Sequence, residues 1–287
     1  MTDRLAALVE QELALPVDPR VTALAKAIAD RHGTASRAVL FYGSCLREQA
    51  LDDLMLDFYL IVADYRAAYD KAWLARANAL IPPNVFPIQH DGLAAKYAVL
   101  SEADFGRLNG PETRNVSVWA RFAQPSRLVW AADRAAVSKI VAAVARAAPT
   151  LLSAAGRIAG ETTLDWWRRA FALTYSAELR AERKGRSGSV VDADPERYER
   201  FGDAAIAAIP AGARSGGWAR RRIEGKALSV LRLAKASATY AGGADYIVWK
   251  INRHAGTKIA LTPWQRRHPL LGALSLLPRL LRSGAIR

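Results

Sequence analysis

Two short apolar runs separated by a Gly-Ser turn constrain the fold of this chain more than any other feature. The first run ends at Gly43-Ser44, and the second carries a single carboxylate, Asp57, near its start. Runs of this length and composition are typical of strands, and the segment between them suits a helix. The sequence therefore predicts a strand over 38–42, a helix over 44–51 and a strand over 56–62.

This unit has the chemistry of a phosphate-binding site. Glycine lets a backbone approach a phosphate closely, and the N–H groups at the start of a helix attract anions. A carboxylate on the neighbouring strand can hold Mg²⁺ against those phosphates. We therefore take Gly43, Ser44 and Asp57 as candidate binding residues. The alternative is a plain strand–turn–helix with an acid near a strand end, because a motif of this size is only a hypothesis.

The rest of the pattern predicts an α+β chain. Asp18, Pro19 and an apolar stripe predict a capped helix over 18–32, and His90-Asp91-Gly92 predicts a hairpin turn. After residue 133 the pattern is mainly helical. Further helices are expected over 67–80 and 163–182, strands over 85–89 and 94–100, and extended segments over 116–119 and 127–130. The division expected is a mixed domain over 1–135, a helical domain over 136–215 and a basic helical region over 216–287.

Positive charge is concentrated in the last quarter of the chain. The net charge is +14, and from residue 214 onward fifteen Lys and Arg face two acids. Such a surface favours an anionic partner: nucleic acid, an anionic membrane or a phosphate-rich substrate. The tail from residue 268 is apolar and interrupted by arginines, but its longest uncharged apolar run is far shorter than the ~20 residues of a membrane span. We expect a peripheral membrane contact through an amphipathic helix, with a helix docked on the core as the alternative.

Other residue types narrow the possible functions. Cys45 is the single cysteine, so no intrachain disulfide can form and a reducing compartment is expected. The four histidines lack the spacing of metal ligands, and no Ser-His-Asp arrangement is readable. The N-terminus has no secretion-signal pattern, so a cytoplasmic location is expected.

Five segments, taken in order, are similar to the motifs of one enzyme family. The family's Tyr-Gly-Ser turn and Met-Leu-Asp-Phe strand correspond to residues 42–44 and 55–58, and its Lys-Tyr-Gly-Val strand corresponds to 96–99. A Tyr-Ile-Ala-Gly-Arg segment is similar to 118–121, and Leu-Ser-Tyr-Ser-Gly-Asp-Phe-Arg to 173–180. The chain thus resembles the mitochondrial-type phosphatidate cytidylyltransferases, peripheral CDP-diacylglycerol synthases of the nucleotidyltransferase superfamily. The order and approximate spacing hold from about residue 38 to residue 201.

The resemblance implies a nucleotidyltransferase-like mixed sheet and an enzyme that transfers CMP from CTP to phosphatidate. The products would be CDP-diacylglycerol and pyrophosphate, and the reaction would need Mg²⁺ and take place on the inner face of a membrane. By the same resemblance, Tyr42, Gly43 and Ser44 would cradle the triphosphate, and Asp57 and Asp64 would bind metal. The residues implied in catalysis are Asp57, Lys96, Arg121, Glu178 and Arg180.

Departures from the family pattern leave other functions open. Nucleotidyltransferases often carry two acids at alternate strand positions, which point to one face, but Tyr59 stands at the second position here. Asp53 and Asp64 lie outside the expected strand. Ala98 and Ala177 stand where the family has glycine, and Glu178 where it has aspartate. The alternatives are a nucleotidyltransferase acting on RNA or another small acceptor, and a non-catalytic phosphate- or lipid-binding relative.

Overall fold

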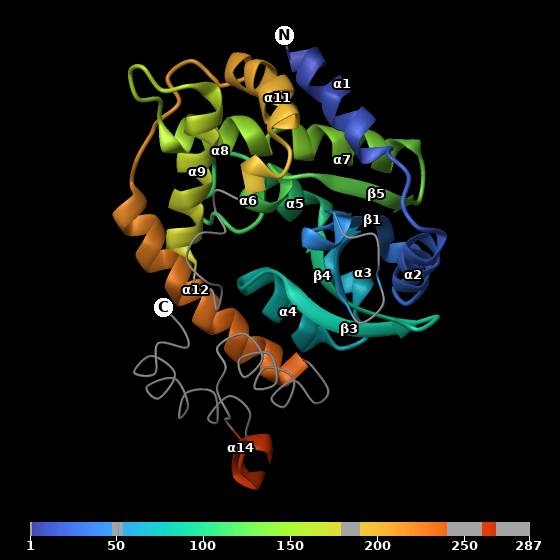
Figure 1. Cartoon of the computed structure of the whole chain (residues 1–287). Coiled ribbons are helices and arrows are strands. Elements are labelled where there is room, and N and C mark those ends of the chain that lie inside the picture. Colours follow the sequence, from blue (N-terminus) through green and yellow to red (C-terminus); the bar gives the residue numbers. More distant parts are fainter. Residues whose placement is uncertain (1, 48–50, 52–53, 179–189, 240–259, 268–287) are drawn as a thin grey trace.

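A five-stranded sheet lies at the centre of the computed structural model, which describes residues 2–47, 51, 54–178, 190–239 and 260–267 (Figure 1). The strand order is β3-β4-β2-β1-β5. Strands β2 and β4 run parallel, and the other neighbouring pairs run antiparallel. The strands are β1 Ser36–Tyr42, β2 Met55–Val62, β3 Asn84–His90, β4 Leu93–Ser101 and β5 Ser126–Ala131. The chain is therefore an α+β protein with a mixed open sheet, as expected from its sequence.

Local sequence signals placed most of the sheet correctly. The expected strands over 38–42 and 56–62 are β1 and β2, and Asp91 and Gly92 form the β3–β4 turn with φ angles of 46° and 77°. The helix expected over 44–51 is described only as the short 3₁₀ helix η2, Ser44–Arg47. The extended segment expected over 116–119 is wrong beyond Val116, because Ser117 and Val118 form a turn and Trp119 begins the helix α6, Trp119–Phe122.

The single helix expected over 67–80 is wrong as well, because the chain forms two helices there. These are α3, Tyr65–Ala68, and α4, Ala72–Leu80. Tyr69 between them has extended backbone, with φ −135° and ψ 128°. Its buried ring meets His32 edge-on at 5.9 Å and lies 6.0 Å from Phe86. Packing of one aromatic side chain thus overrides the local preference for a continuous helix.

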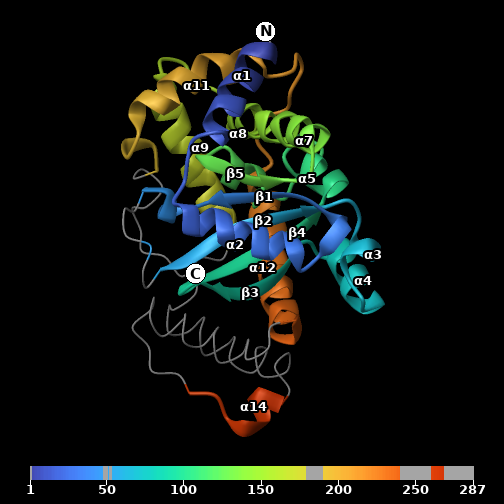
Figure 2. The same cartoon turned by 90° about the vertical axis from the view of Figure 1, so that its right-hand side faces the viewer.

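Each face of the sheet is covered by a different hydrophobic cluster. One face packs against α2, Pro19–Asp30, whose buried residues include Val21, Leu24 and Ile28. The opposite face packs against a larger helical layer, which stands above the sheet in Figures 1 and 2. That layer contains α1 Thr2–Leu13, α5 Glu102–Leu108, α6, α7 Arg134–Ala145, α8 Ala147–Ala155, α9 Thr163–Ala177 and α11 Pro195–Ala207. Its cluster joins residues on both sides of the domain boundary expected at 135, and that division stays a prediction.

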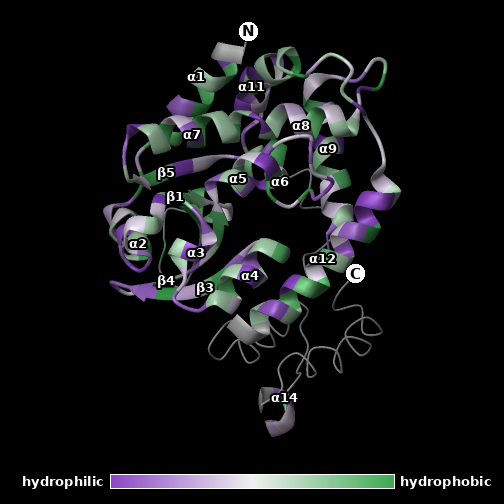
Figure 3. Cartoon of the chain, turned by 180° about the vertical axis from the view of Figure 1, so that it is seen from behind, coloured by the Kyte–Doolittle hydropathy of each residue, from purple (hydrophilic) through white to green (hydrophobic). Residues whose placement is uncertain are grey.

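A long helix, α12, Trp218–Thr239, runs past the helical layer and reaches the edge of the sheet (Figure 1). It contacts α9 at one end and β3 further along. Gly225 allows the close approach to α9, because a Cβ there would lie 2.2 Å from the carbonyl oxygen of Ala177. Figure 3 shows strongly hydrophilic and hydrophobic residues on this same helix. The short α14, Pro263–Arg267, follows in the chain, and the tail from residue 268 lies outside the described residues.

One helical stretch in the described part of the chain, Arg134–Ala155, is long and apolar enough to cross a membrane. It consists of α7 and α8, and 61% of its most apolar window is buried inside the molecule. Several of its residues belong to the large hydrophobic cluster, among them Ile140, Leu151 and Leu152. The stretch thus packs as a core element.

Candidate functional site

A row of polar residues crosses the middle of the sheet at one level. Tyr42 on β1 pairs with Asp57 on β2, and Asp57 pairs with Lys96 on β4. Alternate residues of a strand point to opposite faces. Tyr59 and Ala98, two residues further along their strands, lie in the cluster beneath the helical layer, so the row faces the same side. The sheet therefore presents a carboxylate, an ammonium group and a phenol together to that layer.

Asp57 and Lys96 form a partly buried ion pair. The Lys96 Nζ lies 2.9 Å from Asp57 Oδ1, and the two side chains are 24% and 25% exposed. The parallel register of β2 and β4 brings them side by side, since neighbouring strands lie about 4.8 Å apart. Apart from this ion pair, Asp57 Oδ1 accepts no hydrogen bond of good geometry from the described residues. Its lone pairs can therefore still bind a further positively charged partner.

The Gly-Ser turn lies directly against Asp57. Gly43 has φ +100°, a conformation that residues with a Cβ rarely adopt. A Cβ at this position would meet Asp57 Oδ2 at 3.5 Å, an ordinary contact, so the backbone angle is what requires glycine here. Ser44 is exposed and begins η2. The expected neighbourhood of turn and acid is therefore present in the fold.

Arg121 on α6 adds a second cation on the same side of the sheet. Its Nη1 lies 3.6 Å from Glu178 Oε1, at the end of α9, and donates to the carbonyl oxygen of Ser117. Burial lowers the Arg121 pKa, but Glu178, Tyr59 and Tyr42 outweigh that effect and hold it above its ordinary value. Arg121 is therefore a permanent cation.

The phenol of Tyr42 is coupled to the same groups. Its pKa is raised mainly by burial and then by the charge of Asp57, while Arg121 opposes the shift. Its ring packs 5.2 Å from that of Tyr59, whose other neighbour is Phe122 on α6. Tyr59 thus supports Tyr42 by packing. Tyr42 stays protonated and can act only as a neutral hydrogen-bonding group.

Two cations that the sequence-based interpretation missed reach this region from α12. Arg232 donates through Nε to Pro82 O at 2.8 Å and through Nη1 to Ser117 Oγ at 3.0 Å. Lys235 donates to Pro83 O at 2.8 Å and to Ile81 O. In the sequence, both residues are indistinguishable from the other basic residues of the last quarter of the chain. Their spacing of three residues on one helix was the available signal, because such residues share a helix face.

The structure does not bring Asp64 together with Asp57 at this site. Asp57 lies near the beginning of β2, whereas Asp64 follows its other end. The seven intervening steps correspond to roughly 20 Å along the chain. Asp64 is exposed and accepts hydrogen bonds from the N–H groups of Arg66 at 2.7 Å and Ala67 at 2.9 Å. Its role is to cap α3. Asp53 and Arg180 lie outside the described residues.

The donor set fits Mg²⁺ in one specific way. Within the described ranges, no three His, Cys, Asp or Glu side chains converge. Mg²⁺ is commonly held by one or two carboxylates together with substrate phosphates and water. Asp57 Oδ1, which accepts no hydrogen bond of good geometry from the described residues, can serve as that single carboxylate oxygen. The fit therefore requires a phosphate-bearing substrate to complete the coordination.

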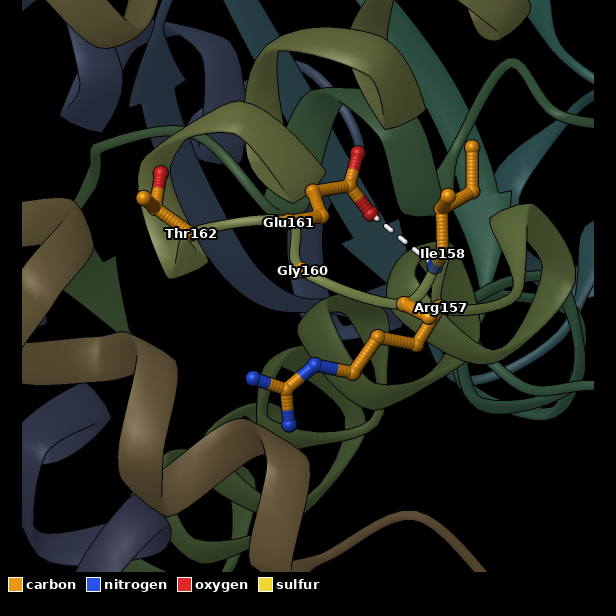
Figure 4. A pocket seen from close by; sticks show the side chains of 6 residues that line it. Arg157, Ile158, Gly160, Glu161 and Thr162 are labelled. Atoms are coloured by element: carbon orange, nitrogen blue, oxygen red, sulfur yellow. Dashed lines mark hydrogen bonds between the residues drawn. The ribbon is translucent and has the colours of Figure 1, made fainter.

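A separate hollow of about 550 Å³ lies between α8 and α9 (Figure 4). Glu161, which lines the hollow, accepts a hydrogen bond from Ile158 N at 3.2 Å and forms an ion pair with Arg169 at 2.7 Å. The guanidinium of Arg157, which also lines it, lies 5.6 Å from the ring centroid of Trp166. These contacts stabilise the α8–α9 loop itself. We assign no function to this hollow.

No protein-family model matches this chain, and no curated protein matches it as a relative.

Proposed function

We propose that this chain is a nucleotidyltransferase that transfers CMP from CTP to phosphatidate and releases pyrophosphate. One observation carries the proposal: Asp57 lies against the turn at Gly43, in a row with Lys96 and beneath Arg121. A glycine turn, one acid and flanking cations are what a triphosphate with Mg²⁺ requires. The five-stranded mixed sheet is compatible with a nucleotidyltransferase-like catalytic domain, which the helical layer would complete.

The reaction needs little from the protein beyond positioning and charge neutralisation. An oxygen of the phosphatidate phosphate attacks the α-phosphorus of CTP and forms a new P–O–P linkage. The bond between the α-phosphorus and the oxygen bridging to the β-phosphate breaks, and pyrophosphate leaves with that electron pair. A phosphate monoester has a second pKa of about 6, so the attacking oxygen is already ionised near neutral pH. No general base is therefore required for this step.

Each site residue then has a role that matches its surroundings. Asp57 would hold Mg²⁺, which neutralises charge on the phosphates when bound. The turn at Gly43 would let the backbone approach the triphosphate. Lys96 and Arg121 would stabilise the negative charge that shifts to the departing pyrophosphate. Glu178 would orient Arg121, whose Nη1 lies 3.6 Å from its carboxylate.

Part of the outer face of α12 suits a membrane surface. Ile223 and Leu231 are 72% and 48% exposed, and Arg222 and Lys226 are exposed on the same helix. Apolar residues flanked by cations are typical of helices that lie among anionic headgroups. We therefore place the proposed enzyme in the cytoplasm, peripherally bound to the inner face of a membrane, where a lipid phosphate is accessible.

The test is product formation by the purified full-length protein. The assay supplies CTP, Mg²⁺ and vesicles containing phosphatidate, and mass spectrometry detects CDP-diacylglycerol while a coupled assay detects pyrophosphate. Asp57→Asn should reduce turnover by about 100-fold or more, because it removes the carboxylate charge at the metal position. Asp64→Asn is the matched control. It should keep full activity, since asparagine still caps a helix.

The same assay separates the alternatives. Extension of an RNA primer instead of the lipid product would select a nucleotidyltransferase of nucleic acid. Binding of nucleotide without any product would select a non-catalytic relative, for which the single acid beside Tyr59 is the relevant observation. Equal loss of activity in Asp57→Asn and Asp64→Asn would contradict the site described above.

A further inference from the structure

Helix α12 brings two cations to the border between the sheet and the helical layer. Gly225 fixes its approach to the end of α9, next to Glu178. Arg232 follows Gly225 by seven residues, two helical turns, and therefore lies on the same side of the helix. The hydrogen bonds of Arg232 to Pro82 and Ser117 confirm this inward direction.

Arg232 is partly buried, and one of its guanidinium nitrogens has no hydrogen-bond acceptor among the described residues. That nitrogen, Nη2, is inaccessible to solvent. The acceptors of its other nitrogens, Pro82 O and Ser117 Oγ, are neutral. A buried charged donor without an acceptor costs free energy. The Arg232 pKa is lowered, first by burial, with the charge of Arg121 acting in the same direction.

The surrounding charges favour an anion at this point. Among the six Lys, Arg, Asp and Glu side chains named in this region, Lys96, Arg121, Arg232 and Lys235 are basic, and Asp57 and Glu178 are acidic. The two acids each pair with one base, Asp57 with Lys96 at 2.9 Å and Glu178 with Arg121 at 3.6 Å. The positive charge brought by α12 therefore exceeds what the acids balance. A guanidinium is suited to a phosphate, because its planar fork can donate two parallel hydrogen bonds.

The position of Arg232 relative to Asp57 indicates which of the two proposed substrates, CTP or phosphatidate, this arginine would bind. Arg121 and Arg232 share Ser117, the first through its carbonyl oxygen and the second through its hydroxyl. Arg232 donates to Pro82 O, and Asn84, two residues further on, begins β3 opposite Val99 of β4. Val99 pairs with Leu60, three residues beyond Asp57 on β2, about 10 Å further along the strand. Gly43 lies on the other side, because Tyr42 pairs with Asp57 whereas Leu40 pairs with Tyr59. The glycine turn and Arg232 thus approach Asp57 from opposite directions.

We propose that Arg232, assisted by Lys235, is the binding site for the phosphate monoester of the acceptor. The inference rests on the proposed function and assigns the acceptor side of the same site. In-line displacement requires the attacking and leaving oxygens on opposite sides of the reacting phosphorus. With the triphosphate against Gly43, the attacking phosphate enters from the α12 side. Arg121, between the two, contacts the transferred group.

The experiment uses the full-length protein and a soluble short-chain phosphatidate, with calorimetry for binding and steady-state kinetics for turnover. Arg232→Met should weaken phosphatidate binding and raise the KM for phosphatidate by about tenfold or more, while the KM for CTP stays within about twofold. Arg232→Lys should give an intermediate loss, since it keeps the charge but not the fork. Arg220→Met, an exposed arginine of the same helix that pairs with Glu224 at 2.7 Å, is the matched control and should behave as the wild type.

Each outcome decides the assignment. Equal phosphatidate affinity in the Arg232→Met and Arg220→Met variants overturns it, as does a selective loss of CTP binding in Arg232→Met. Early melting of Arg232→Met with unchanged phosphatidate affinity shows a purely structural arginine. If Arg232→Met does not fold, Arg232→Lys decides by the same comparison. Arg232-dependent binding of the short-chain phosphatidate without any turnover supports the α12 site and refutes the proposed reaction, so the two failures are distinguishable.

Discussion

A buried ion pair between the first helix and α11 gives the sharpest stability prediction. Arg197 is 4% exposed and donates to both carboxylate oxygens of Glu12, with Nη2 lying 2.8 Å from Oε1. Its Nη1 donates to Ala123 O at 3.2 Å, and its guanidinium lies 4.4 Å from the ring centroid of Phe201. Removing Glu12 leaves this cation buried with one neutral acceptor and the rings of Phe201 and Tyr198.

The size of the effect follows from that uncompensated charge. Glu12→Ala should lower the free energy of unfolding by about 3–5 kcal/mol, the cost of breaking a buried pair. At roughly 2–4 °C per kcal/mol for a chain of this size, the Tm should fall by about 6–20 °C. Asp30→Ala is the control. Its pair with Lys26 is equally close, at 2.7 Å, but the side chains are more than 60% exposed. That change should cost only about 0.3–0.5 kcal/mol.

A double variant tests the physical reason. Glu12→Leu combined with Arg197→Met removes both charges and fills the space with apolar atoms, so most of the lost stability should return. Urea unfolding followed by far-UV circular dichroism measures all of these variants. The reasoning is refuted if Glu12→Ala and Asp30→Ala are equally stable, or if the double variant is less stable than Glu12→Ala alone.

Two further predictions concern the site. Gly43→Ala should destabilise the fold by about 1–3 kcal/mol because of its φ of +100°. Gly106→Ala, in a helix with open space at Cβ, should be neutral or stabilising, and urea unfolding compares the two. The pKa of Lys235 is lowered to about 7, first by burial and then by Arg232, from an ordinary value of 10.5. The unfolded chain therefore binds more protons between these values, so stability should rise with pH from about 7 to about 10.5. Lys235→Met should flatten that rise in Tm measured from pH 7 to 9.5, whereas Lys26→Met should leave it unchanged.

Features fixed by neighbouring residues were predictable from the sequence. The helix α2 begins where Asp18 accepts a hydrogen bond from Arg20 N at 2.8 Å, as its capping residue indicated. The β3–β4 turn and the strands around the Gly-Ser turn follow from equally local patterns. The juxtaposition of Gly43 and Asp57 was also predictable, because a strand–turn–strand unit brings its first turn beside its second strand.

Features fixed by distant contacts were not predictable. The interruption between α3 and α4 depends on the burial of Tyr69 beside His32, which precedes it by 37 residues. The arginines of α12 also show that contacts between distant residues are not predictable from local sequence. Arg222 is exposed to solvent whereas Arg232 is directed inward, although both belong to one basic stretch. Charge counting treats the two alike, and only the docking of α12 through Gly225 separates them.

The register of β2 links the hydrophobic core to the candidate chemistry. Leu56, Phe58 and Leu60 pack on the α2 side of the sheet, which turns Asp57 and Tyr59 toward the helical layer. A shift of one residue would exchange the two sets, burying the carboxylate against α2 and placing leucine beside Lys96. The apolar residues of β2 therefore determine where the acid stands without contacting any substrate. Their alternation is the physical reason why a single aspartate in an apolar strand can face Lys96, Arg121 and the glycine turn at once.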